Sequence, residues 1–354
     1  MITRADMNHA LMLDGRAPTK TFIVEAHTDD PQDFLGHMAG KPNVEPTRDT
    51  HLFRVHVPEG VIWVDQLDSR FWSFHTDISM QPANAFLRKE IERHRELDWV
   101  WLPSDHLRHM WPRSISRQVK TTFNGKGFVG SSAAATDLRV QLSGHDADYL
   151  LEYISKEPRY RSSVSFQSVQ ETLTDPDLGY LEEAVSRMGK FVVSGDSFEF
   201  HSQFVRTVLQ RYKALVTLCE SKAISYDSVG PSDSGFTING HPIVVRFKRE
   251  IEDLPSFMGQ LLSSRAPFRL WGSPEIDEDY ARVDAVDLHV GSTMKIDVGT
   301  DWMRIYLSKG SCGNTVARMV ANLQHTFDSA LYFEDSELQA ALLGQRAALG
   351  SRGN

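Results

Sequence analysis

The chain has 354 residues, enough for about two or three domains. Hydrophobic residues make up 41% and charged residues 24%, the balance of a globular protein with a buried core. Acidic residues outnumber basic ones by 47 to 38, which excludes a uniformly basic coat for nucleic acid but not a local basic face. Two cysteines cannot build a disulfide framework, and no signal peptide or membrane span is visible, so we expect a cytoplasmic protein without a membrane partner.

A strand, a short helix and a closing proline recur three times along the chain. The strands are expected at 22–27, 138–142 and 243–247, and the prolines are Pro42, Pro158 and Pro267. Each copy continues into alternating strands around a Gly/Asp turn and then into an amphipathic helix, expected at 83–95, 202–215 and 314–327. A period of about a hundred residues indicates duplicated domains rather than a solenoid.

We therefore expect an α+β fold of three tandem β-α-β(4)-α units with antiparallel sheets. This element order resembles the half-domain of TATA-binding-protein-like folds, in which a curved sheet carries helices on one face. The resemblance implies sheet faces that are left open, and it implies no function by itself. The expected segments are a tail (1–20), repeat unit 1 (21–105), a basic linker (106–136), repeat unit 2 (137–220), a loop (221–235), repeat unit 3 (236–335), and a C-terminal helix, expected at 339–349, with a tail (336–354).

Two local predictions concern packing and turns. In the helix expected at 146–154, Leu150, Tyr153 and Ile154 lie at helical spacing and are predicted to form its packed stripe. The Asn239-Gly240 pair predicts a tight hairpin over residues 236–243.

A basic stretch without acidic residues runs from His106 to Thr136. Guanidinium and ammonium groups interleaved with rings suit single-stranded nucleic acid or another phosphate-bearing partner. The alternative is a linker whose basic side chains pair with acidic neighbours. The candidate contact residues are Arg108, Arg113, Arg117, Lys120 and Lys126, with Trp111 and Phe123 as stacking rings.

A glycine-rich segment between a strand and a helix is a candidate anion-binding loop. Its residues are Lys309, Gly310, Gly313 and Thr315, and the order of residues does not match the phosphate-loop consensus. Cys312 beside Lys309 is a candidate nucleophile. The alternative is an ordinary strand-to-helix connection capped by Asn314 or Thr315.

Other ionisable clusters give weaker signals. Asp105, His106 and His109 lie within five positions, and no metal-ligand motif accompanies them, so we predict neither a metal site nor a cofactor. A nuclease-like group of Asp287, Asp297 and Lys295 is the remaining acidic candidate.

No catalytic sequence signature is present, which favours a non-catalytic recognition protein that uses open sheet faces. Its expected ligand is nucleic acid or a nucleic-acid-associated protein. Two alternatives stay open. One is an enzyme, hydrolase or nuclease-like, with a site at Cys312/Lys309 or Asp287/Asp297/Lys295. The other is a subunit of a larger protein assembly.

Overall fold

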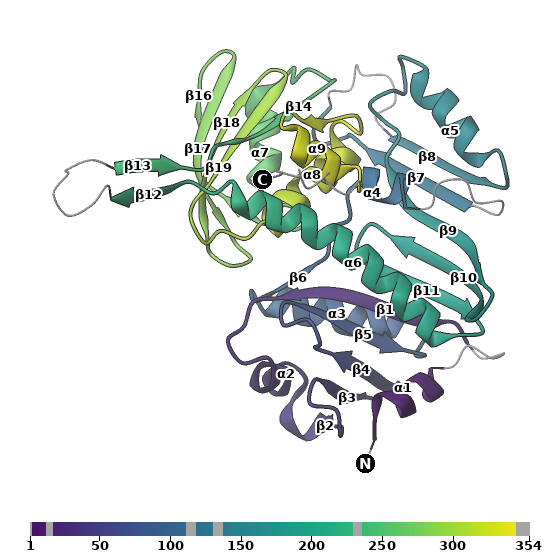
Figure 1. Cartoon of the computed structure of the whole chain (residues 1–354). Coiled ribbons are helices and arrows are strands. Elements are labelled where there is room, and N and C mark those ends of the chain that lie inside the picture. The colour runs from purple at the N-terminus through teal and green to yellow at the C-terminus, as the bar shows by residue number, and fades with distance from the viewer. Residues whose placement is uncertain (1, 12–16, 111–117, 130–136, 229–235, 345–354) are drawn as a thin grey trace, which may run out of the picture. The chain divides into compact units, whose positions relative to one another are not determined.

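The computed structural model describes residues 2–11, 17–110, 118–129, 137–228 and 236–344 (Figure 1). The candidates Trp111, Arg113 and Arg117 lie outside these residues. The chain divides into two compact units: the first comprises 1–101, 113–118 and 168–208, and the second 102–112, 119–167 and 209–354. Two of the boundaries fall within β9 (Phe166–Asp175) and α6 (Phe198–Ser221).

The first unit contains one antiparallel sheet with its strands in the order β2-β3-β4-β5-β1-β11-β10-β9, and β6 pairs with β1. Its remaining elements are α1 (Arg4–Ala10), β1 (Thr19–Ala26), α2 (Pro31–Ala39), the 3-10 helix η1 (Lys41–Asn43), β2 (Val44–Pro46), β3 (Leu52–Val57), β4 (Gly60–Asp65), β5 (Phe71–Thr76), α3 (Met80–Arg93), β6 (Leu97–Trp99), β10 (Gly179–Ser186) and β11 (Lys190–Gly195).

Strand β1 is the centre of this sheet. All eight of its residues are buried, as expected for a strand with neighbours on both edges and side chains packed on both faces. Phe22 is opposite Phe74 of β5 and Lys190 of β11, so β1 joins segments that are far apart in the sequence. Within the segment expected to be an N-terminal tail, Thr3 and Asp6 form a capping box that starts α1.

The second unit contains a sheet in the order β15-β17-β18-β19-β14-β20, with β16 paired to β17, and β7 lies beside β8. Its elements are α4 (Ser104–Arg108), β7 (Gln118–Asn124), β8 (Asp137–Ser143), α5 (Ala147–Lys156), β12 (Ser225–Ser228), β13 (Phe236–Asn239), β14 (Ile243–Arg246), α7 (Leu254–Leu261), β15 (Leu270–Trp271), β16 (Glu275–Ile276), β17 (Tyr280–Asp287), β18 (Thr293–Gly299), β19 (Trp302–Leu307), α8 (Asn314–Thr326), β20 (Tyr332–Phe333) and α9 (Ser336–Leu342).

Helix α8 is buried from Asn314 to His325, including its polar residues. A buried polar side chain needs hydrogen-bond partners, and Gln324 shows how they are supplied. Its carbonyl oxygen accepts the Ser104 N–H at 2.7 Å, and its amide nitrogen donates to Asp105 at 2.8 Å. The polar residues at the start of the same helix build the candidate site below.

The mixed helix and antiparallel sheet content confirms the α+β class. Two local predictions are wrong. Strand β13 pairs with β12, with Tyr226 opposite Ile238, instead of forming a hairpin around Asn239-Gly240. The packed stripe of α5 is Ala147 and Leu151, one position around from the predicted stripe.

The last described helix, α9, also begins earlier than the helix expected at 339–349. Asp335 accounts for this start, because its side chain accepts the N–H groups of Glu337 and Leu338. None of the described helices combines the length and apolar character needed to cross a membrane.

Candidate functional site

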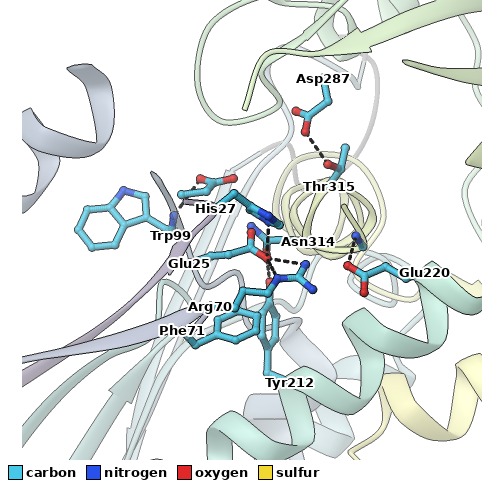
Figure 2. Close-up of polar contacts among 12 residues, drawn as sticks. Glu25, His27, Arg70, Phe71, Trp99, Tyr212, Glu220, Asp287, Asn314 and Thr315 are labelled. Carbon is cyan, nitrogen blue, oxygen red and sulfur yellow. Dashed lines mark hydrogen bonds and ion pairs between the residues drawn. The ribbon is translucent and has the colours of Figure 1, made fainter. Parts of the chain in front are cut away.

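The first turn of α8 is held by two side chains of α6. The Glu220 carboxylate accepts the Gly313 N–H at 2.9 Å, and the Tyr212 hydroxyl donates to the Asn314 side chain (Figure 2). Residues eight apart on a helix lie two turns along the same face, so α6 presents both groups to the start of α8. Gly313 is the N-cap residue of α8, in place of the predicted Asn314 or Thr315.

This arrangement changes the interpretation of the predicted anion-binding loop. Lys309 and Gly310 are exposed, whereas Gly313 and Thr315 are buried. The N–H of Gly313 already has a carboxylate of the protein's own as its acceptor. The structure therefore does not bring these four residues together around an open anion site.

A buried charged pair lies one turn further into α8. The Arg318 guanidinium donates to Asp287, its Nε donates to the Phe268 carbonyl at 3.0 Å, and both charged side chains are fully buried. The Thr315 hydroxyl donates to the other Asp287 oxygen at 2.7 Å (Figure 2). Burial opposes ionisation of Asp287, but Arg318 and Thr315 outweigh it and hold the pKa of this carboxyl below its usual value.

His289 and Cys312 are the residues of this region with donors for a metal or for thiol chemistry. A ring nitrogen of His289 and the sulfur of Cys312 lie within 4.8 Å of each other, and both residues are buried. The Asp287 carboxylate accepts the backbone N–H of His289 at 3.2 Å and so fixes the backbone at this residue. Imidazole and thiolate are ligands that zinc prefers, and they are also the base and nucleophile of thiol enzymes.

Sequence reasoning singled out Cys312 and Asp287 separately and missed His289. Lys309, the partner predicted for Cys312, is exposed, while Cys312 is buried. The available signal was an aspartate two residues before a histidine at the end of a strand, a spacing that lets the carboxylate bind the histidine backbone.

The first unit has a polar cluster of its own at the end of β1. Glu25 is fully buried, and one of its oxygens lies 2.7 Å from the Arg70 Nε and 3.3 Å from the His27 Nε2 (Figure 2). The Arg70 guanidinium also lies 5.3 Å from the centroid of the Phe71 ring. Glu25 and His27 are the residues of this cluster that are of metal-ligand type.

The predicted nuclease-like group is not assembled. Asp297 accepts a hydrogen bond from Arg282 at 3.1 Å, and the two residues are opposite each other on β18 and β17. Arg282 lies five positions before Asp287 on β17, a separation of about 17 Å along a strand. Lys295 is opposite Asp284, also away from Asp287.

Asp105, His106 and His109, which the sequence places close together, have separate partners in the structure. His106 is buried, and its Nε2 lies 2.8 Å from the Ala341 carbonyl, while Asp105 binds Gln324. His109 is exposed, with its Nδ1 2.9 Å from the Asp105 carbonyl. Burial raises the pKa of the Asp105 carboxyl and lowers the pKa of His106 to about 4.

The described part of the basic stretch is split between surface and core. Arg108, Lys120 and Lys126 are exposed, and the Lys126 Nζ lies 3.9 Å from Asp137. Phe123 is fully buried, because it shares the inward face of β7 with Val119. Its ring is therefore not available for stacking on a base in this structure.

Exposed rings lie nearby in sequence on α5. Tyr149 and Tyr153 have 69% and 70% of their surface exposed, and they are one helical turn apart. Three exposed basic residues follow these rings: Lys156, Arg159 and Arg161. We call these five residues the α5 tyrosine surface.

Comparison with known proteins places the chain in a family. The model of the family described as MJECL33-like protein matches residues 9–341. The uncharacterized protein MJECL33 of Methanocaldococcus jannaschii is 26% identical over 358 residues, which cover 89% of this chain and 86% of that protein. The match includes the residues at the start of α8, Glu25 with its partners His27 and Arg70, and the α5 tyrosine surface. The chain therefore belongs to the MJECL33-like protein family.

Proposed function

We propose that the protein is a recognition protein that binds single-stranded nucleic acid through the α5 tyrosine surface. The observation that carries the proposal is the pair of exposed rings, Tyr149 and Tyr153, followed by three basic side chains. Stacking of a base on an aromatic ring contributes about 1–3 kcal/mol, and basic side chains add phosphate contacts. The combination of basic and aromatic side chains that was predicted to contact nucleic acid at residues 106–136 is therefore proposed for α5 and the residues that follow it.

The charged residues on and after α5 determine how much phosphate contacts contribute to this binding. Lys156 pairs with Glu152 at 2.7 Å, and the Arg159 guanidinium lies 5.7 Å from the centroid of the Tyr160 ring. Because an acidic neighbour already faces Lys156, stacking rather than phosphate neutralisation is expected to supply most of the affinity. The salt dependence should then be shallow, with a slope of about one or two phosphate contacts.

Fluorescence anisotropy with short single-stranded DNA and RNA at two salt concentrations tests the proposal. We expect the Tyr149→Ala/Tyr153→Ala variant to bind at least about tenfold more weakly, because two stacking contacts are lost. Tyr226→Ala is the matched control, since Tyr226 is 68% exposed on β12, a different element. Equal affinity of the double variant and the wild type would overturn the proposal. Absence of binding at low salt would instead favour a protein partner, as in a larger assembly.

We also propose that the α5 tyrosine surface belongs to a fold of three tandem β-α-β(4)-α units. Their element order is similar to that of TATA-binding-protein-like folds. What supports it is a shared strand order in two of the expected units. The order β2-β3-β4-β5-β1 in repeat unit 1 corresponds to β15-β17-β18-β19-β14 in repeat unit 3. In both, the first strand of the copy returns beside its last long strand. The middle copy differs, because β8 lies beside β7.

A second candidate function is a thiol-dependent enzyme, and the proximity of His289 and Cys312 favours it. The group beside the Cys312 thiol is thus the His289 imidazole, whereas the sequence analysis expected Lys309. The sulfur precedes the first turn of α8, where the helix dipole favours an anion. A buried imidazole within 4.8 Å is close enough to take the thiol proton after a small adjustment.

Alkylation by iodoacetamide distinguishes this candidate, because the chain offers an internal control. Cys219 is fully buried, and burial raises the pKa of its thiol. In a Cys219→Ser background we expect Cys312 to react at least about tenfold faster than Cys219 reacts in a Cys312→Ser background. His289→Ala should remove this difference. Equal rates in the two single-cysteine proteins would argue against thiol chemistry at Cys312.

A further inference from the structure

The second unit has a small cavity that neither proposed function uses. Its volume is about 180 Å³, and it is lined by the segment that follows β7, the loop before α7 and the residue after α8. At about 30 Å³ per water molecule, this volume corresponds to about six waters. A volume of this size is suited to a small molecule.

Arg249 provides a cation in the wall of the cavity. Its Nη2 donates to the Ser163 hydroxyl at 3.1 Å, and its guanidinium carbon lies 5.6 Å from the centroid of the Phe123 ring. Its Nε is buried and has no hydrogen-bond partner within the part of the chain that the structure describes. Because no water-sized group reaches this nitrogen, a ligand carboxylate in the cavity would bind a terminal nitrogen of the guanidinium instead.

A buried carboxylate fixes the backbone at Arg249. The Asp328 carboxylate accepts the N–H groups of Lys248 and Arg249, and Asp328 itself is fully buried. Burial lowers the pKa of Arg249, although the charges of Asp328 and Glu252 oppose this shift. The guanidinium is therefore a partly desolvated cation on a fixed loop, which is favourable for binding a small anion.

The opposite charge lines the same cavity. Glu250 and Glu252 contribute to the lining and are exposed, while Asp253 caps α7 through the Ser256 N–H at 2.9 Å. A phosphate or sulfate at Arg249 would meet these carboxylates and be repelled. A ligand that carries a positive group beside its carboxylate would instead pair with both charges.

Aromatic rings supply the apolar part of the lining. Phe128 and Phe327 line the cavity, and their ring centroids are 6.3 Å apart. Phe128 also packs edge-on against Phe257 and Phe268, so its ring belongs to the core and is held rigidly. An aliphatic side chain of a ligand would be buried against these two rings.

We propose that this cavity binds a free α-amino acid with a small aliphatic side chain. Its carboxylate binds Arg249, its ammonium group faces Glu250 and Glu252, and its side chain packs on Phe128 and Phe327. The site is independent of the α5 tyrosine surface and of Cys312, so loss of either proposed function leaves it standing.

Isothermal titration calorimetry on the full chain tests the proposal with three related probes. We expect L-leucine to bind, and both L-leucinamide and 4-methylpentanoate to bind at least about tenfold more weakly, because each lacks one charged group. Arg249→Gln and Glu252→Gln should each weaken L-leucine binding by a similar factor. Arg246→Gln is the matched control, since Arg246 pairs with Glu334 and does not line the cavity.

Three results would overturn the proposal. Absence of L-leucine binding to the wild type removes the site, and equal binding of all three probes reduces it to an apolar cavity. An Arg249→Gln variant that keeps its folding transition and binds L-leucine as the wild type does removes the assigned role of the guanidinium. If that variant unfolds, Glu252→Gln decides the question, because its exposed side chain can be changed without disturbing the core.

Discussion

At the scale of single residues, the core of the first unit contains a chain of buried polar side chains. The Thr21 hydroxyl lies 2.8 Å from His75 Nδ1 and 2.7 Å from His201 Nε2, and His201 Nδ1 lies 2.7 Å from Glu183. Burial lowers the pKa of each histidine to about 3 and raises the pKa of Glu183 well above its usual value. All three ionisable groups are therefore neutral near pH 5, which is the protonation state that this core tolerates.

The variant Glu183→Gln should change how stability depends on pH. The native state keeps a proton on Glu183 above pH 4.5 that the unfolded chain releases, so the wild type loses stability as pH rises through this range. The amide cannot ionise, so the unfolding free energy of the variant relative to the wild type should rise by about 1.4 kcal/mol per pH unit above pH 4.5. This rise continues up to the native pKa of Glu183.

Urea denaturation at a series of pH values measures this difference. Glu182→Gln, on the opposite face of β10, is the matched control for the change from carboxyl to amide. The two histidines act in the other direction: the unfolded chain takes up their protons below pH 6.5, so both proteins lose stability as pH falls from 6.5 toward 3. Parallel stability curves for Glu183→Gln and the wild type would contradict the assignment of a buried, protonated Glu183.

At the scale of elements, helix α2 depends on its N-cap residue. The Asp30 side chain accepts the N–H groups of Gln32 and Asp33 at 3.1 and 3.0 Å. Asp30→Ala should lower the unfolding free energy by about 1 kcal/mol, because two backbone donors lose their acceptor. Ser79 is the matched control: it is the N-cap of α3 but makes no capping hydrogen bond, so Ser79→Ala should change stability by less than about 0.5 kcal/mol. Equal losses in urea denaturation would show that capping is not the cause.

Elements were also the scale at which the sequence was most informative. Alternation and helical spacing predicted strands and helices because these patterns are local. The same alternation, applied to residues 118–124, places Phe123 on the face of Val119 and opposite Lys120. A reading of this stretch as a strand rather than a linker would have predicted a buried ring. The helix α5 was predicted, but spacing alone did not distinguish the stripe of Ala147 and Leu151 from the neighbouring one.

The candidate site was less predictable than the elements, because its contacts join distant segments. Asp287 and Thr315 were each singled out, yet only the fold shows that one binds the other. Glu220 reaches Gly313 from a helix 93 positions earlier, and no local pattern encodes such a pair. His289 was missed for the same reason, since its importance comes from Cys312 on another element.

At the scale of the whole molecule, the two compact units are interleaved along the chain. The first unit is completed by residues 168–208, which follow residues 102–112 and 119–167 of the second unit in the sequence. Composition and sequence repeats do not predict this interleaving of the two units, because it depends on which sheet edge a strand joins.

The central place of β1 has a consequence for how the protein is made. Its N-terminal half pairs with β11, so one edge of the strand has no partner until Lys190 to Val193 leave the ribosome. At roughly 5–20 residues per second, synthesis of the intervening chain takes on the order of ten seconds or more. During that time the unpaired N–H and C=O groups of this strand edge are exposed to other nascent chains. The protein is therefore prone to aggregation during this part of translation. A chaperone that covers this strand edge would raise the yield of folded molecules.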